Sequence, residues 1–237
     1  MNEVSRKCVG IIFGGQSNEH AVSIESAKAI FAALNSEINK KNFATKVFYI
    51  NKKGKWFNSK DSLLILKNSR DIDKFIVNSP FENINVFEQI DCKDIDIWFP
   101  IIHGANGEDG SIQGLLKFTQ KPFVGTGILG SALGMDKIIM KIIFAHLKIP
   151  QVNFFIIKDT NLDENHNLKI IEDQLIKKLK FPMFIKPANS GSSIGISKVK
   201  NQSDIFRALQ KAWSIDHRII VEEGLEVREL EVGIIGK

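Results

Sequence analysis

A loop of small polar residues between two apolar segments is the part of the sequence best suited to bind an anion. KPANSGSSIG (residues 186–195) separates FPMFI from IGISKV, two segments whose composition predicts β-strands. A flexible backbone can turn its N–H groups toward a phosphate, the hydroxyls of Ser190, Ser192 and Ser193 add donors, and Lys186 supplies positive charge. The alternative is a mobile hairpin turn, because glycine and serine are common turn formers.

Two other polar loops follow segments that read as buried strands. HGANGEDG contains His103 and Glu108, and GGQSNEH places Glu19 and His20 at the start of a predicted helix. Open α/β sheets bind their ligands at the carboxyl ends of the strands, where both loops fall. Taken singly, His103 could be an ordinary loop histidine, Glu108 a neighbour of a helix cap, and Glu19 a partner of the helix dipole.

Two familiar nucleotide motifs do not explain these loops. Gly125 to Gly130 fits G-x-G-x-x-G, but a dinucleotide site needs an acidic residue about 20 positions later, at the end of a second strand. The sequence there is the helical run FAHLK, so a tight turn between domains is the preferred interpretation. No G-x-x-x-x-G-K-[ST] motif is present, and any phosphates must be bound by other means.

The elements that must position these loops predict an α/β chain. CVGIIF, ATKVFYI and DIWFPII read as buried strands of a parallel sheet, and a helix after QSNEH has one apolar face, formed by Ile24, Ala27, Ile30, Phe31 and Leu34. Residues 51–91 are polar, and few elements are predicted there.

The pattern changes after PFVGTG, which predicts a domain boundary near Thr126. Helices are expected on ILGSALGM, DKIIMKIIFAHL, residues 168–180 and DIFRALQKAW, and strands on VNFFII, FPMFI and IGISKV. Two closing strands, RIIVEE and ELEVGII, are expected at the end of the chain.

Composition excludes several classes of function. The net charge is +5, but 32 basic and 27 acidic residues are interspersed, which argues against a nucleic-acid-binding surface. Cys8 and Cys92 form no C-x-x-C pair, so neither a disulfide framework nor a cysteine zinc site is expected. No signal peptide or membrane span is predicted, and these features together predict a cytoplasmic protein with no membrane partner.

Five ordered motifs together resemble the D-alanine–D-alanine ligases of the ATP-grasp superfamily: GGQSNEHAVS, HGANGEDGSIQG, VGTGILGSALGMDK, FIKPANSGSSIGISKV and VEEGLEVRELEVGIIG. The resemblance implies a Rossmann-like, parallel-sheet domain (pre-ATP-grasp) over residues 1–126. An incomplete ATP-grasp domain should follow, with its first subdomain and phosphate lid over residues 127–220 and the start of its second over residues 221–237. The serine-rich loop would be the lid that closes over ATP.

The resemblance also implies roles for individual residues. Glu19 would bind the ammonium group of the first D-alanine, His103 would lie near that substrate, and Ser192 would be the lid hydroxyl in the same hydrogen-bond network. Glu108 and Asp109 would shape their loop. The ATP-binding residues would be Lys137 and Lys186 at the phosphates, Ser190, Gly191 and Ser193 in the lid, Glu222, Glu223 and Leu225 at adenine, and Glu229 at the ribose. Without the resemblance, Glu222, Glu223 and Glu229 would be read as surface charges at a strand end.

The implied reaction is ATP-dependent ligation of two D-alanines for peptidoglycan synthesis. ATP would phosphorylate the first D-alanine to an acyl phosphate, which the amine of the second would attack. The family uses Mg²⁺ or Mn²⁺ and is typically homodimeric. The sequence ends at Lys237, whereas family members continue for about a hundred residues, so the metal ligands are expected beyond it and this chain alone is expected to be inactive.

Two alternatives stay open at this point. The first is a ligase of the same class with D-lactate or D-serine as the second substrate, because the residues that select it lie mostly beyond Lys237 in the family. The second is a truncated nucleotide-binding protein without catalysis. A further expectation concerns stability: RIIVEE and ELEVGII would be apolar strands without sheet partners, and so prone to aggregation.

Overall fold

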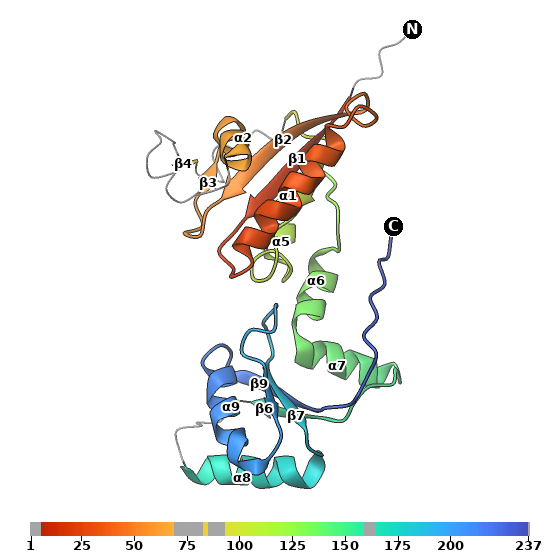
Figure 1. Ribbon diagram of the computed structural model, residues 1–237. Helices are drawn as coiled ribbons and strands as arrows, with labels where there is room; N and C mark the ends of the chain where they lie inside the picture. Colours follow the sequence, from red (N-terminus) through yellow and green to blue (C-terminus); the bar gives the residue numbers. More distant parts are fainter. Residues whose placement is uncertain (1–5, 69–82, 85–92, 159–164, 237) are drawn as a thin grey trace. The chain divides into compact units, whose positions relative to one another are not determined.

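The computed structural model describes residues 6–68, 83–84, 93–158 and 165–236, which form two compact units (Figure 1). Unit 1 ends at Met135 and unit 2 begins at Asp136. Cys92 and most of the segment that was hard to predict lie outside the described residues. The predicted boundaries at residues 126 and 220 stay predictions.

Unit 1 is built on a mixed five-stranded sheet with the strand order β4-β3-β2-β1-β5. The three strands predicted from their apolar runs pair in parallel, and the two short strands extend the sheet in antiparallel fashion. The strands are β1 (Lys7–Gly14), β2 (Phe43–Ile50), β3 (Trp56–Phe57), β4 (Asn83–Ile84) and β5 (Ile97–Pro100). The parallel core of the sheet is therefore confirmed.

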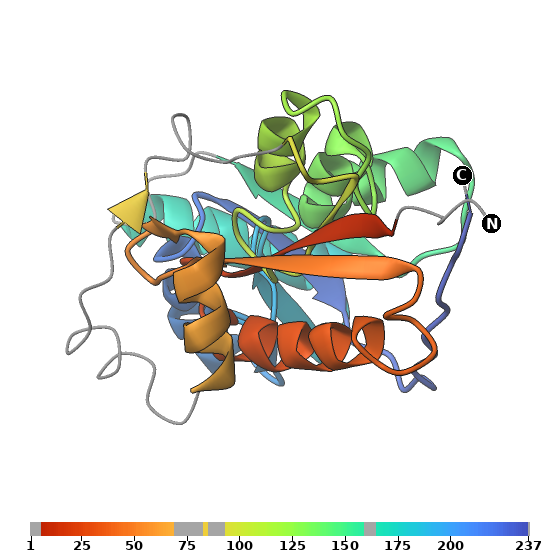
Figure 2. The same ribbon diagram turned by 90° about the horizontal axis from the view of Figure 1, so that it is seen from above.

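Helices cover both faces of this sheet. The described helices of unit 1 are α1 (His20–Leu34), α2 (Ser59–Lys67), α5 (Ser111–Lys117) and α6 (Ile128–Met135). Figure 2 shows α1 and α2 on one side of the sheet and α5 on the other. The predicted apolar face of α1 packs into the hydrophobic core between the sheet and the helices α1 and α2. Trp98 is fully buried in the hydrophobic core on the side of α5. Because helices cover both faces of the sheet, side chains on both faces of β1 and β2 are buried, which explains the nearly continuous apolar runs of these strands.

Unit 2 is an antiparallel four-stranded sheet with the strand order β6-β9-β7-β8. Its strands are β6 (Phe154–Lys158), β7 (Met183–Pro187), β8 (Ser197–Val199) and β9 (Arg218–Glu223). Its helices are α7 (Lys137–His146), α8 (Asn165–Lys178), the 3₁₀ turn η1 (Gln202–Asp204) and α9 (Ile205–Trp213). The main core lies between one face of the sheet and α8 and α9, and Ile138 of α7 packs against Ala188 and Ile220 on the other face.

The end of the chain differs from the prediction in two ways. RIIVEE does not lack sheet partners, because β9 is a central strand that pairs with β6 on one side and β7 on the other. ELEVGII is not a strand: residues 224–236 have no regular structure, and Leu230, Val232 and Ile234 are exposed. The alternating sequence of ELEVGII does not by itself produce a strand, because a strand also needs a neighbouring strand that pairs with its backbone hydrogen-bonding groups.

None of the helices in the described parts of the chain is long and apolar enough to cross a membrane.

Candidate functional site

Unit 2 contains a cavity of about 890 Å³ beside the carboxyl end of β9. Most of its lining residues come from two of the five sequence motifs, FIKPANSGSSIGISKV and VEEGLEVRELEVGIIG. Among its lining residues are the predicted ATP-binding residues Lys186, Ser193, Glu222, Glu223, Leu225 and Glu229. Phe184 and Lys198 line it as well, although no role was predicted for them from the sequence.

Glu222 lies at the centre of the charged groups of this cavity. Its Oε1 is 2.9 Å from Nζ of Lys141, and its Oε2 accepts a hydrogen bond from Nζ of Lys186. Burial acts to raise the pKa of the Glu222 carboxyl, but the hydrogen bonds and charges of the two lysines outweigh burial and hold this pKa below its ordinary value. Glu222 is 8% exposed, so its interpretation as a surface charge is wrong.

The two other glutamates differ from Glu222 in their surroundings. Glu223 is partly buried, and its carboxylate accepts hydrogen bonds from Nδ2 of Asn153 at 3.1 Å and from the backbone N–H of Lys180 at 3.0 Å. Its side chain therefore ties β9 to two neighbouring segments. Glu229 is exposed.

Lys137 joins helix α7 to the serine loop. It is the first residue of α7, and its Nζ donates a hydrogen bond to the carbonyl of Ser190 at 2.5 Å. Burial and the positive charge of Lys186 lower the pKa of Lys137. Two lysines that the sequence predicts at phosphates therefore lie close enough to repel each other, an arrangement that an anion between them would stabilise.

The helix start that carries Lys137 is fixed by Asp136. Its carboxylate caps α7 by accepting hydrogen bonds from the N–H groups of Ile138 and Ile139, and it accepts one from Nη1 of Arg218 at 2.7 Å. Burial would raise the pKa of Asp136, but the backbone hydrogen bonds and Arg218 lower it. This ion pair ties the MDK motif to β9.

The serine loop connects β7 to β8, which pair antiparallel. Its base is held where the backbone N–H and Nδ2 of Asn189 donate to Oδ2 of Asp216. Ser192 and Ser193 are exposed and have positive φ values of 47° and 58°, while the hydroxyl of Ser190 donates to the carbonyl of Ile194 at 3.0 Å. The loop therefore presents two serines at the surface above a fixed base.

In unit 1, the polar loops after β1 and β5 meet. Oγ of Ser17 donates to the carbonyl of His103 at 2.6 Å, and a Cβ placed on Gly104 would lie 2.5 Å from Oε2 of Glu19. Glu19 thus lies directly against the loop that carries His103. The structure brings together these two residues, which the sequence placed at the ends of different strands.

His103 is held by neighbours on both sides of its ring. Its Nε2 is 3.2 Å from Oγ of Ser26, and its Nδ1 is 3.7 Å from Oε1 of Glu108. Oε2 of Glu108 also accepts a hydrogen bond from the N–H of Gly104, and Asp109 accepts from the N–H groups of Asn106 and Ser111. Burial acts to raise the pKa of Asp109, but these backbone donors lower it. Both acids therefore stabilise their own loop.

Residues that support the Glu19 loop were not recognised from the sequence as buried. His20 is 5% exposed, and its Nδ1 lies 2.5 Å from the carbonyl oxygen of Gly15 and its Nε2 3.0 Å from the hydroxyl of Tyr49. Oγ of Ser23 accepts from the N–H of Gly14 and donates to the carbonyl of Ile101. Their position in the GGQSNEHAVS motif was the available signal.

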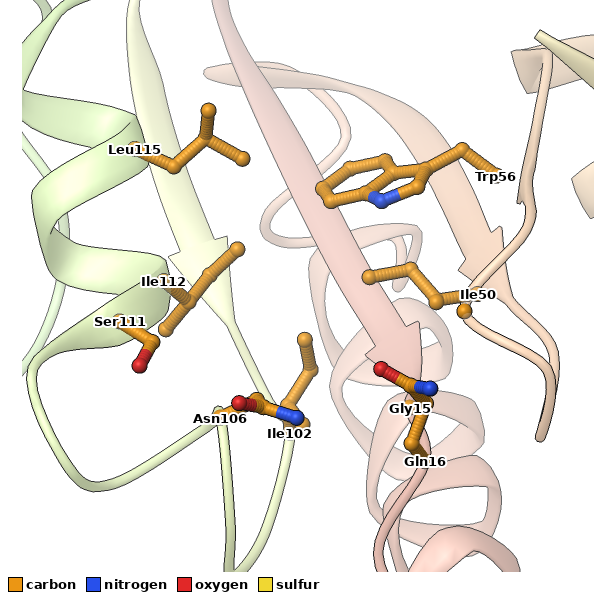
Figure 3. A pocket seen from close by; sticks show the side chains of 10 residues that line it. Gly15, Gln16, Ile50, Trp56, Ile102, Asn106, Ser111, Ile112 and Leu115 are labelled. Atoms are coloured by element: carbon orange, nitrogen blue, oxygen red, sulfur yellow. The ribbon is translucent and has the colours of Figure 1, made fainter. Parts of the chain in front are cut away.

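A smaller cavity of about 170 Å³ lies beside Gly15 and Gln16, at the start of the loop that carries Glu19 (Figure 3). Trp56, Ile50 and Leu115 form apolar parts of its wall, and Gln16 and Asn106 are polar lining residues. It lies at the carboxyl edge of the unit 1 sheet, close to the residues that the resemblance assigns to the first substrate.

The described residues include no group of three or more His, Cys, Asp or Glu side chains that could hold a metal ion. Glu222 in the unit 2 cavity is paired with two lysines.

Comparison with known proteins agrees with this architecture. Family models described as the D-ala D-ala ligase N-terminus and C-terminus match residues 8–126 and 143–237. A D-alanine–D-alanine ligase of Prochlorococcus marinus subsp. pastoris is 58% identical over 100% of this chain and 67% of its own length. Another, from strain MIT 9312, is 59% identical with the same coverage.

Solved structures match as well. The VanG D-Ala:D-Ser ligase of Enterococcus faecalis has a TM-score of 0.76 and 29% identity, covering 94% of this chain and 64% of the other. The D-alanine–D-alanine ligase of Coxiella burnetii has a TM-score of 0.76 and 26% identity, covering 93% and 64%. The chain thus spans about two thirds of the length of the relatives it matches.

A parallel α/β unit followed by an antiparallel sheet that carries a lysine-lined cavity defines an enzyme of the ATP-grasp class. Within that class, the chain belongs to the D-alanine–D-alanine ligase family.

Proposed function

We propose that the protein joins two D-alanine molecules at the expense of ATP, supplying D-alanyl-D-alanine for peptidoglycan synthesis. The observation that carries this proposal is the cavity of unit 2, where Lys186, Glu222, Glu223, Leu225 and Glu229 surround one space large enough for a nucleotide. Family membership supports it, because the curated relatives are named as D-alanine–D-alanine ligases.

ATP would supply the phosphoryl group that activates the carboxylate of the first D-alanine as an acyl phosphate. Lys137 and Lys186 would bind the negative charge of the phosphates, and the serine loop would add backbone and hydroxyl donors from Ser190, Gly191 and Ser193. Closure of this loop would exclude water from the acyl phosphate, and Ser192 would join the substrate network. Glu222, Glu223 and Leu225 would hold adenine, and Glu229 the ribose.

In unit 1, Glu19 would bind the ammonium group of the first D-alanine, and His103 would lie beside that substrate. Three observations support this assignment: Ser17 donates to the backbone carbonyl of His103, Ser26 contacts the His103 ring, and Oε2 of Glu19 lies close to Gly104. We further propose Mg²⁺ as the metal of the reaction, a cytoplasmic location, and a homodimer, which light scattering of the purified protein would test.

The direct test is to incubate the protein with ATP, Mg²⁺ and D-alanine and to measure phosphate release and the dipeptide by mass spectrometry. For the protein at the full length of its relatives, of which this chain spans 67%, we expect D-alanyl-D-alanine with D-alanine and none with L-alanine, whereas the 237-residue chain alone is expected to bind ATP without forming dipeptide. Failure to bind ATP would contradict the assignment of the unit 2 cavity. Binding of ATP without dipeptide formation by the longer protein would favour the alternative of a nucleotide-binding protein that does not catalyse.

One solved relative gives reason to test a second acceptor, since the VanG protein is named a D-Ala:D-Ser ligase. The same assay with equal D-alanine and D-serine would measure the preference. We expect D-alanyl-D-alanine to be the main product, because the relatives at 58% and 59% identity carry the D-alanine–D-alanine name. Mainly D-alanyl-D-serine would shift the assignment to that acceptor.

A further inference from the structure

We propose that Lys141 is a positioning residue of the ATP site, which orients the carboxylate of Glu222 and, through it, the ammonium group of Lys186. The inference rests on the proposed function, because it takes the unit 2 cavity to be the ATP site. Lys141 lies one helical turn after Lys137 on α7, outside the motifs from which the ATP-binding residues were predicted.

The geometry separates Lys141 from the residues that line the cavity. Both Lys186 and Glu222 line it, whereas Lys141 is not among the lining residues and its side chain is only 11% exposed. Its Nζ lies 2.9 Å from Oε1 of Glu222, and Lys186 donates to Oε2 of the same carboxylate. Lys141 therefore acts on the nucleotide through Glu222.

Lys141 has further contacts through its side chain and its backbone. Its Nζ lies 5.6 Å from the centre of the Phe154 ring, and its backbone carbonyl accepts a hydrogen bond from Nε2 of Gln151 at 3.0 Å. A buried ammonium group is costly unless it is paired, and Glu222 provides the pair. Because each oxygen of Glu222 binds a different lysine, the carboxylate can serve both only in one orientation.

Removing Lys141 should change how Lys186 is held. With Oε1 released, the Glu222 carboxylate is free to turn both oxygens toward Lys186, and it would compete more strongly with a phosphate for that ammonium group. While Lys141 is present, it binds Oε1 of Glu222, so that only Oε2 is available to Lys186. Lys186 then stays in reach of Glu222 while part of its charge remains available to the nucleotide.

The experiment is to measure ATP affinity by calorimetry for the wild-type protein and for Lys141→Met and Lys141→Arg. We expect about tenfold weaker binding for K141M, from loss of one charge-assisted hydrogen bond, and recovery of most of the affinity in K141R. The matched control is Lys177→Met, the same change at an exposed lysine of α8, which should leave the affinity unchanged. Thermal unfolding of each variant verifies that the fold persists.

A double-mutant cycle with Glu222→Gln distinguishes positioning from a general loss of positive charge. If Lys141 acts through Glu222, K141M should weaken ATP binding by less than about twofold in the E222Q background. Equal losses in both backgrounds would contradict the proposal, because a distant charge would act whether or not Glu222 is ionised.

The outcomes separate this inference from the proposed function. A wild-type protein that fails to bind ATP would contradict the proposed function itself. Normal ATP binding in the wild type together with unchanged binding in K141M would leave the proposed function intact and would overturn the role of Lys141.

Discussion

At the scale of single residues, the candidate site depends on charges that are paired before any ligand arrives. Glu222 holds two lysines, Asp136 holds Arg218 and the start of α7, and Ser17 fixes the loop of His103. Such pairs place the functional groups in advance, so less ordering is needed on binding. The sequence indicated Lys137 and Lys186 but not Lys141, because a lysine within a helix reads as a solvated charge until its burial is known.

Lys186→Ala should weaken ATP use without loss of the fold. Lys186 lines the cavity, and its ammonium group is the one that Glu222 orients, so we expect ATP to bind about tenfold more weakly or worse. Isothermal titration with ATP measures the effect, and Lys177→Ala on α8 is the control. Unchanged binding would remove Lys186 from the phosphate site.

The lowered pKa of Glu222 predicts how stability depends on pH. Its ordinary pKa of 4.5 applies to the unfolded chain, and the pKa is lower in the folded protein, so the unfolded chain binds the proton more tightly. The stabilisation by Glu222 is therefore complete well above pH 4.5 and is lost as the pH falls through the folded value. Urea unfolding between pH 7 and pH 3 should show a shallower acid loss for Glu222→Gln; identical slopes would contradict this.

At the scale of elements, most of the predicted segments were correct and one was not. Alternation and apolar runs located β1, β2, β5, β7 and β9, because each segment buries the side chains that the pattern marks. ELEVGII has the same alternation but lies outside the sheet, where none of the described strands pairs with it. The order β6-β9-β7-β8 could not be predicted, since it depends on pairing between segments far apart in the chain.

The turn that leads from the serine loop into β8 requires glycine at position 195. Gly195 has a φ of +75°, and a Cβ there would lie 2.4 Å from Cδ1 of Ile215 and 3.1 Å from Cγ of Pro187. We expect Gly195→Ala to lower the free energy of unfolding by about 1–3 kcal/mol, measured by denaturant titration. Gly191→Ala is the control, because Gly191 is not among the positive-φ residues of the described chain; an equal loss there would contradict the argument.

At the scale of the whole molecule, two units carry separate cores. The polar groups assigned to the first substrate belong to unit 1, and the cavity assigned to ATP is lined by unit 2 alone. The sequence predicted both sets of loops from five motifs, but it could not show which residues gather around one cavity. Burial and pairing decide that, as Phe184, Lys198 and Lys141 illustrate.

Damage to the core of unit 1 should leave ATP binding nearly intact. Trp98 is fully buried, and its Nε1 donates to Oγ1 of Thr119 at 3.0 Å, so Trp98→Ala should destabilise unit 1 by about 3–5 kcal/mol. We expect ATP affinity to change by less than about twofold at a temperature where unit 2 is folded. Calorimetric unfolding and titration measure the two effects, and a large loss of affinity would show that the units depend on each other.

The alternation of side chains along β7 and β9 has an optical consequence. Phe184, Lys186 and Glu222 lie on the face of the sheet that Ile138 of α7 covers, whereas Trp213 packs with the core on the opposite face. Trp213 is therefore shielded from the cavity, but an indole at position 184 would face it. Phe184→Trp, opposite Glu222 in the register, would turn occupancy of the cavity into a fluorescence signal.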